Sequence, residues 1–147
     1  MSTAIREALA AFGRARGQGV GRRLVPLAIR LLVSVNLLYV AIFLKFAGVP
    51  ESVTLFMRMS QAVHGLLSEP VFRLGSAMFE TVVAVLLLIP KTARLAAGLT
   101  AVWMTVVILS HIFVLGYGWF FADALMVMLL ALIYLLLTRE FTDMPKE

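Results

Sequence analysis

The sequence contains no cysteine and carries little charge. Without cysteine the chain cannot use thiolate catalysis, thiol–disulfide exchange or thiolate-held iron–sulfur clusters. Only 14% of the 147 residues are charged, whereas about 25% is usual in soluble domains. Hydrophobic residues make up 62% of the chain, and its mean hydropathy is +1.00. This composition excludes a soluble enzyme and predicts a small polytopic membrane protein with one domain.

Four segments are long and apolar enough to cross a bilayer, which takes about 20 residues with roughly 17 as the lower limit. The second of these segments is short, and Arg73 and Lys91 would flank it with side chains that reach the interface. We therefore predict an all-α bundle of four transmembrane helices, forming a membrane domain over residues 24–138. The expected spans cover about residues 24–46, 74–89, 95–115 and 119–137.

Positive charge is concentrated in residues 1–30, which hold six of the 13 Lys and Arg residues. If the basic arm, residues 1–23, is cytoplasmic, the cytoplasmic segments carry ten of these charges and the outer segments three. The positive-inside rule then predicts that both termini, including the tail 139–147, are cytoplasmic, most simply in a bacterial inner membrane. Anionic lipid is the expected partner of the arm, and nucleic acid is not. Residues 1–12 suit either an interfacial helix or a frayed tail.

The longest connection lies between the first two spans. Pro50, Glu51 and Ser52 can open a helix, and apolar residues then recur at helical spacing. The segment is too polar to cross a membrane. We expect an amphipathic helix over residues 52–69 on the outer surface, ended by Glu69 and Pro70.

Each span contains one ionisable residue toward its outer end: Lys45, Glu80, His111 and Asp123. Such residues are unfavourable within a bilayer by about 2.5–3.5 kcal/mol each. Helical rise places all four within about 10 Å of the outer end. The sequence therefore predicts a polar cluster in the outer third of the bundle, and Asn36 is expected to hydrogen-bond to another helix.

These residues also have structural explanations. Lys45 can extend to the interface, Asp123 can interact with a helix dipole, and the four together can form an ion-pair network that specifies packing. The functional alternative is a pocket that holds a ligand headgroup or passes protons. A metal site made of Glu80, His111 and Asp123 has too few ligands to be predicted.

Aromatic residues accompany this cluster. Trp103 shares a helix face with His111, while Trp119 and Tyr134 share one with Asp123. An aromatic slot with a His and a carboxylate suits a flat amphipathic ligand such as a quinone. Trp119 can alternatively belong to the aromatic belt at the membrane interface.

Several short segments within residues 25–138 resemble the DoxX/DoxX-like family of small four-helix membrane proteins. Three of them follow one another: a Glu that opens an apolar helix (Glu80), a Pro turn (Pro90), and Thr-x-Arg with an Ala-rich helix start (Thr92, Arg94 and residues 95–97). The others are a Lys after the first apolar helix (Lys45) and a Ser-His pair (Ser110 and His111). The resemblance implies a four-helix fold. For some members it also implies a role in membrane oxidoreductases, including thiosulfate:quinone enzymes.

On this basis we expect a subunit or accessory of a quinone-linked membrane redox system, with redox partner subunits or a homo-oligomer. Glu80 and Asp123 would relay protons, His111 would hydrogen-bond a quinone carbonyl, and Lys45 would balance the carboxylates. Trp103, Trp119 and Tyr134 would line the ligand site. The alternatives are a small transporter or lipid-handling protein, and a scaffold subunit without chemistry.

Overall fold

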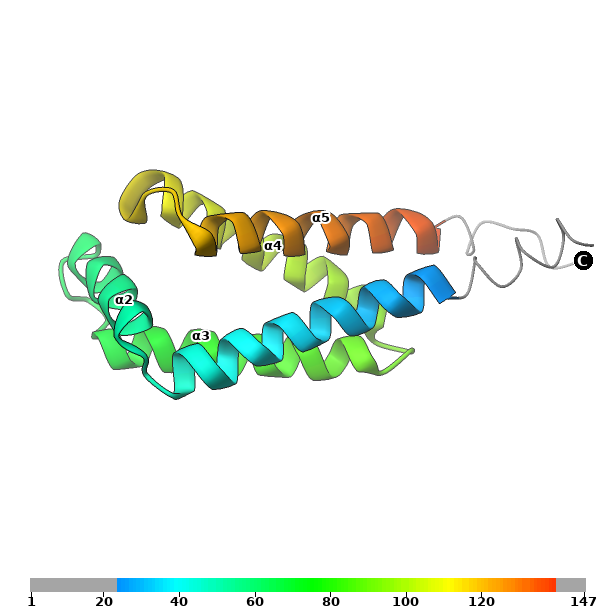
Figure 1. The fold of residues 1–147 in the computed structure, drawn as a ribbon, viewed down its shortest axis with the longest axis horizontal. Coiled ribbons are helices and arrows are strands. Elements are labelled where there is room, and N and C mark those ends of the chain that lie inside the picture. The colour runs from blue at the N-terminus through cyan, green and yellow to red at the C-terminus, as the bar shows by residue number, and fades with distance from the viewer. Residues whose placement is uncertain (1–23, 140–147) are drawn as a thin grey trace, which may run out of the picture.

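The computed structural model of the chain describes residues 24–139, shown as the coloured ribbon in Figure 1. Every regular element in this part of the chain is helical. The basic arm, residues 1–23, and the tail beyond residue 139 lie outside the described residues. The expectations for those two segments therefore stay predictions.

Four of the helices are long and apolar enough to cross a membrane. They are the first helix (Leu24–Phe46), α3 (Glu69–Leu88), α4 (Ala93–Ser110) with its continuation η2 (His111–Leu115), and α5 (Trp119–Arg139). A shorter helix, α2 (Pro50–Ala62), connects the first helix to α3. The chain is thus a multi-pass integral membrane protein with the predicted all-α four-helix architecture.

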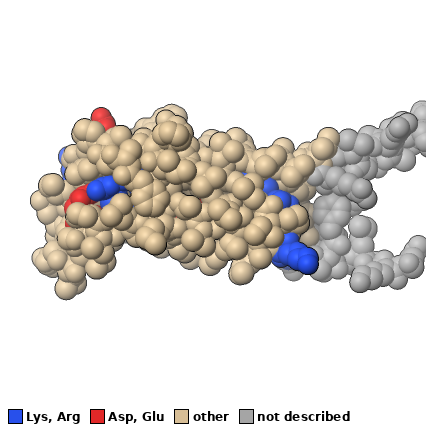
Figure 2. All heavy atoms as spheres, turned by 90° about the horizontal axis from the view of Figure 1, so that it is seen from below, with Lys and Arg blue, Asp and Glu red and all other residues tan. Residues whose placement is uncertain are grey.

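The surface of the bundle matches a bilayer. On the face in Figure 2, charged side chains gather toward the two ends of the described part and leave a broad uncharged belt between them. Large apolar side chains such as Val35, Val102 and Leu136 are exposed. A continuous apolar surface of this kind is unfavourable in water and favourable against lipid chains.

Consecutive spans run in opposite directions, so successive connections lie at opposite ends of the bundle. The start of the described part of the first helix, the end of α5 and the turn between α3 and α4 lie at one end, which we call the terminal end (Figure 1). Helix α2 and the turn at residues 116–118 lie at the opposite end, which we call the α2 end. Because the number of spans is even, the first and the last span have their outer termini at the same end of the bundle.

Close packing between the helices depends on small residues and on bonds to main-chain carbonyls. Ser34 of the first helix donates to the Ala84 carbonyl oxygen of α3 at 3.1 Å. Arg30 donates to the carbonyl oxygens of Leu87 and Leu88, each at 2.8 Å. These carbonyls belong to the last turn of α3, where a helix lacks internal donors. Alanines without exposed surface allow close approach. They include Ala41, Ala77, Ala84, Ala93 and Ala96.

The connection between α2 and α3 corrects the sequence prediction. Helix α2 ends at Ala62 instead of residue 69, because His64 and Gly65 take positive φ values of 54° and 73°. Helix α3 begins at Glu69 instead of residue 74. Pro70 lies in its first turn, where the missing N–H is not needed. Glu69 and Pro70 thus open α3 rather than close α2, and the second span is a full 20 residues long.

Two helices end in π-helical segments at the α2 end. The first is η1 (Val40–Phe46) and the second is η2, in which the Gly116 amide bonds to the His111 carbonyl oxygen at 2.7 Å. Short π-helical segments are rare in proteins, and those that occur are frequently found at functional sites. Lys45 lies in η1, and His111 opens η2.

Candidate functional site

A buried ion pair joins the first helix to α3. Lys45 Nζ lies 2.5 Å from Glu80 Oε1 and donates to Ser76 Oγ at 2.7 Å. The two charged side chains are only 11% and 3% exposed. Lys45 Nζ also lies 5.5 Å from the ring centroid of Phe56 in α2, within the range of a cation–π contact. Side chains of α2 and α3 therefore surround the lysine.

Helix α4 contributes a second donor to the same carboxylate. Trp103 Nε1 donates to Glu80 Oε1 at 2.9 Å, and its ring packs against Phe79 with centroids 4.7 Å apart. Glu80 Oε1 thus accepts from two side chains, while Oε2 is buried without a partner. An unpartnered carboxylate oxygen in a residue that is 2% exposed is unfavourable until water or a ligand binds it.

Asp123 belongs to a different hydrogen bond. Its Oδ1 accepts from Asn36 Nδ2 at 2.8 Å, which links α5 to the first helix. The expected interhelical bond of Asn36 is therefore confirmed. The structure brings Lys45 and Glu80 into contact and pairs Asp123 with Asn36, so Lys45 balances only one of the two carboxylates.

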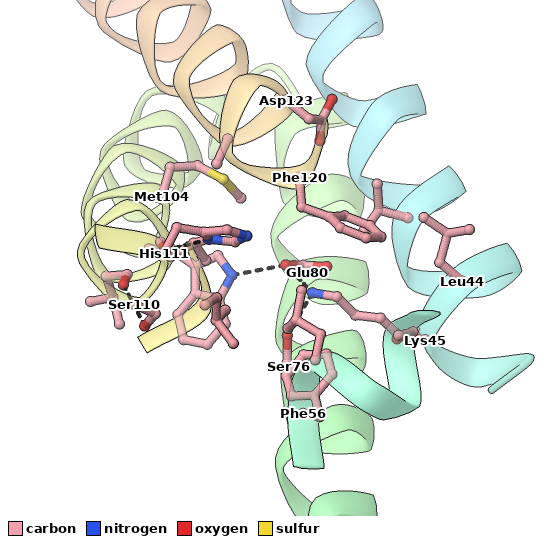
Figure 3. A pocket seen from close by; sticks show the side chains of 18 of the residues that line it. Leu44, Lys45, Phe56, Ser76, Glu80, Met104, Ser110, His111, Phe120 and Asp123 are labelled. Carbon is pink, nitrogen blue, oxygen red and sulfur yellow. Dashed lines mark hydrogen bonds and ion pairs between the residues drawn. The ribbon is translucent and has the colours of Figure 1, made fainter. Parts of the chain in front are cut away.

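The ring of His111 is buried, with 4% of the residue exposed. Its Nδ1 lies 2.9 Å from the Val107 carbonyl oxygen, one turn earlier in α4. A carbonyl oxygen only accepts, so Nδ1 carries the hydrogen, and Nε2 of the neutral ring is an acceptor. Figure 3 shows the His111 ring directed inward from its helix, toward the space near Glu80.

These side chains line one cavity of about 190 Å³ (Figure 3). Pockets for drug-sized ligands measure roughly 300–1,000 Å³, whereas an engineered cavity of about 150 Å³ binds benzene. The cavity therefore has room for one small ring. All four spans and α2 contribute to its wall. Its polar residues are Asn36, Lys45, Ser52, Ser76, Glu80, Trp103, Ser110, His111 and Asp123, and the remainder are apolar.

Glu80 lies near the middle of α3. Because the helix begins at Glu69, Glu80 is eleven residues into it, or about 16 Å from its start. Its partner Lys45 is the last residue but one of the first helix. The depth of the polar cluster in the bilayer stays a prediction.

A second hollow of about 420 Å³ lies between α2 and the turn before α5. Its lining includes the exposed residues Glu51, Thr54 and Arg58 of α2. Four residues line both this hollow and the cavity: Leu55, His111, Leu115 and Phe120. The imidazole of His111 is the only ionisable side chain among these four. It therefore stands between the buried cavity and a hollow at the α2 end.

Trp119 and Tyr134 do not line the cavity, although the sequence pattern groups them with Asp123. Trp119 is 77% exposed at the start of α5, as the alternative prediction of an interfacial belt requires. Tyr134 is buried in the helix core. The α4 face is different, because Trp103, Met104, Val107, Ser110 and His111 all line the cavity.

Sequence reasoning missed Ser52, Phe56 and Ser76. Ser76 precedes Glu80 by four residues and so shares its helix face, a signal that could have identified it. Ser52 and Phe56 reach the cavity only because α2 folds back over the bundle. Periodicity within α2 does not contain that information.

Within residues 24–139, no group of three His, Cys, Asp or Glu side chains could hold a metal ion. Comparison of the chain with protein-family models, curated proteins and solved structures found no match.

Proposed function

We propose that this chain is a DoxX-like membrane protein that binds a quinone and serves as a subunit or accessory of a quinone-linked membrane redox system. The observation that carries the proposal is the cavity of about 190 Å³, with Glu80 and His111 in its wall. A quinone headgroup is a single flat ring with oxygens at opposite edges. The cavity lies inside a membrane bundle, which suits a ligand that dissolves in lipid.

The apolar part of the lining supports a ring-shaped ligand. Phe56, Trp103 and Phe120 offer aromatic faces, and Met59 and Met104 are flexible side chains that adapt to an irregular shape. Aromatic rings and thioethers interact favourably with another flat ring. The wall thus combines stacking surface with a few fixed polar groups, as ligand sites usually do.

The polar part supports proton exchange. Interconversion of a quinone and its quinol moves two electrons and two protons. His111 lies between the cavity and the hollow at the α2 end, so we assign it the transfer of protons between them. The electrons would pass to or from a partner subunit.

We also propose that the terminal end faces the cytoplasm of a bacterial cell. Ten of the 13 Lys and Arg residues belong to the basic arm, to the first helix at Arg30, to the turn between α3 and α4 with the start of α4, and to the tail. Only Lys45, Arg58 and Arg73 belong to segments at the α2 end. The positive-inside rule favours this orientation.

The test is to purify the protein in mild detergent and to quantify bound lipophilic molecules by mass spectrometry. Val107→Phe should fill the cavity and remove a near-stoichiometric quinone. Val102→Phe is the matched control, because Val102 lies on the same helix and is 67% exposed. It should retain the quinone. The double variant Glu80→Gln/His111→Ala should also lose it.

Other results would replace the proposal. Wild-type protein that neither retains nor binds an added short-chain quinone has a different function. Substrate-dependent flux in proteoliposomes would then indicate a transporter or lipid-handling protein. Cavity variants that change only stability or partner capture would indicate a scaffold subunit.

A further inference from the structure

Three buried side-chain atoms lack a hydrogen-bond partner among the residues the structure describes: Asn36 Oδ1, Ser52 Oγ and Glu80 Oε2. They come from the first helix, α2 and α3, and all three residues line the same cavity. Buried polar atoms without partners are rare in folded proteins. Three of them around one cavity point to a ligand that binds these atoms.

Two of these three atoms can only accept hydrogen bonds. Asn36 Nδ2 donates to Asp123, so the amide oxygen is the free group, and an oxygen there only accepts. Glu80 is ion-paired to Lys45, and its free Oε2 is a carboxylate acceptor. His111 Nδ1 bonds to a carbonyl, which leaves Nε2 of the neutral ring as an acceptor. Among these four groups, only the Ser52 hydroxyl can donate.

We propose that the cavity binds the reduced, hydroquinone form of its ligand more tightly than the oxidised quinone. This inference rests on the proposed function and adds a preference for one redox state. A hydroquinone carries two O–H donors that match the acceptors of the wall. A quinone carries two carbonyl acceptors, which would face the oxygens of Glu80 and Asn36 without a proton between them. The ligand class is a lipophilic single-ring diol.

This pattern also reverses the role expected for His111. The sequence suggests that its ring donates to a quinone carbonyl. With Nδ1–H committed to Val107, the neutral ring instead accepts from a hydroxyl of the quinol through Nε2. Acceptance of a hydroxyl proton is the first requirement of a base in quinol oxidation.

Ser52 provides the sharpest probe, since it is 2% exposed and its hydroxyl has no partner in the free protein. Ser52→Ala removes an unsatisfied group, so the free protein should not lose stability. A loss of ligand binding would then report a contact with the ligand. Ser60→Ala is the matched control on the same helix. Ser60 Oγ donates to the Leu67 carbonyl oxygen at 2.7 Å and lines neither hollow.

The experiment titrates purified full-length protein with a short-chain benzoquinone and, anaerobically, with the same molecule reduced to its hydroquinone. Isothermal calorimetry measures Kd for both forms. We expect the hydroquinone to bind at least about tenfold more tightly, because bonds to a charged acceptor are the strongest of the set. Ser52→Ala should weaken hydroquinone binding about three- to tenfold at an equal or higher melting temperature. Ser60→Ala should lower the melting temperature and leave Kd unchanged.

Glu80→Gln tests the direction of the preference between the two redox forms. The glutamine amide introduces a donor where Oε2 is an acceptor, so the ratio of the two Kd values should move toward the quinone. The serine variants decide the inference independently if this variant does not fold.

The outcomes separate the inference from the proposed function. Equal or tighter binding of the quinone would overturn the redox preference and leave quinone binding standing. Binding of neither form would overturn both. Hydroquinone binding that Ser52→Ala leaves unchanged would overturn the assignment of the unpartnered atoms to the ligand.

Discussion

Polar side chains that join helices near the terminal end differ from those around the cavity in what they bind. Near the terminal end, Arg30 and Ser34 donate to main-chain carbonyls of α3. Around the cavity, Lys45 and Trp103 donate to another side chain, the carboxylate of Glu80. The unpartnered polar atoms also lie around the cavity.

This difference distinguishes contacts that hold helices together from contacts that can serve a ligand. Every helix carries main-chain carbonyls, so a donor that binds one joins two helices without requiring any particular partner residue. A network of side chains needs several matched residues on different helices, and a buried ion pair is weak evidence for stability by itself. The network around Glu80 is therefore explained better by a ligand than by packing alone.

Lys45→Met should have the largest effect on stability. It leaves the Glu80 carboxylate buried without its cation, which should lower the free energy of unfolding by about 3–5 kcal/mol. Unfolding in detergent, followed by circular dichroism, measures this change. The double variant Lys45→Met/Glu80→Met should recover most of the loss, because no unpaired charge remains. A single variant as stable as wild type would mean that the cavity region is not held by this pair.

Arg30→Met tests the terminal end. It removes two hydrogen bonds to carbonyls in the last turn of α3, so we expect a loss of about 2 kcal/mol. Ligand binding in the cavity should not change. Lys91→Met is the control, since Lys91 is exposed at the same end. Altered ligand affinity in Arg30→Met would show that the two regions are coupled.

Trp103→Phe should have a smaller effect in the cavity region. The ring contact with Phe79 is kept, while the N–H bond to Glu80 is lost, which should lower stability by about 1–2 kcal/mol. Ligand affinity should fall as well, because the Glu80 carboxylate loses a positioning donor. Trp119→Phe, at an exposed position, should change neither quantity in the same thermal and calorimetric assays. Equal behaviour of the two variants would contradict the assigned network.

Two buried serines differ in whether the hydroxyl has a hydrogen-bond partner. Ser34→Ala breaks a bond to a main-chain carbonyl and should destabilise the protein by about 1 kcal/mol. Ser52→Ala breaks no bond and should leave stability unchanged or raise it. Thermal unfolding of both variants under one set of conditions measures the difference. Equal destabilisation would remove the distinction between the regions.

Composition and local pattern were sufficient for much of this protein. Long apolar runs determine the spans because each helix satisfies its own main-chain hydrogen bonds in lipid. The predicted first span ends at residue 46, where the observed helix also ends. Helical periodicity placed Trp103 and His111 on one face, and both line the cavity. Counting along helices also brought Lys45 and Glu80 to a common region, and the structure joins them in an ion pair.

Tertiary packing determines which of these groups touch. Lys45 and Glu80 are 35 residues apart, and Asn36 and Asp123 are 87 apart. Such pairs depend on how each helix is rotated about its axis, which packing against its neighbours sets. The π-helical turns at Lys45 and His111 shift that rotation away from a regular 3.6-residue period. The fold-back of α2 brings Ser52 to the cavity for the same reason, since contacts between distant segments position it.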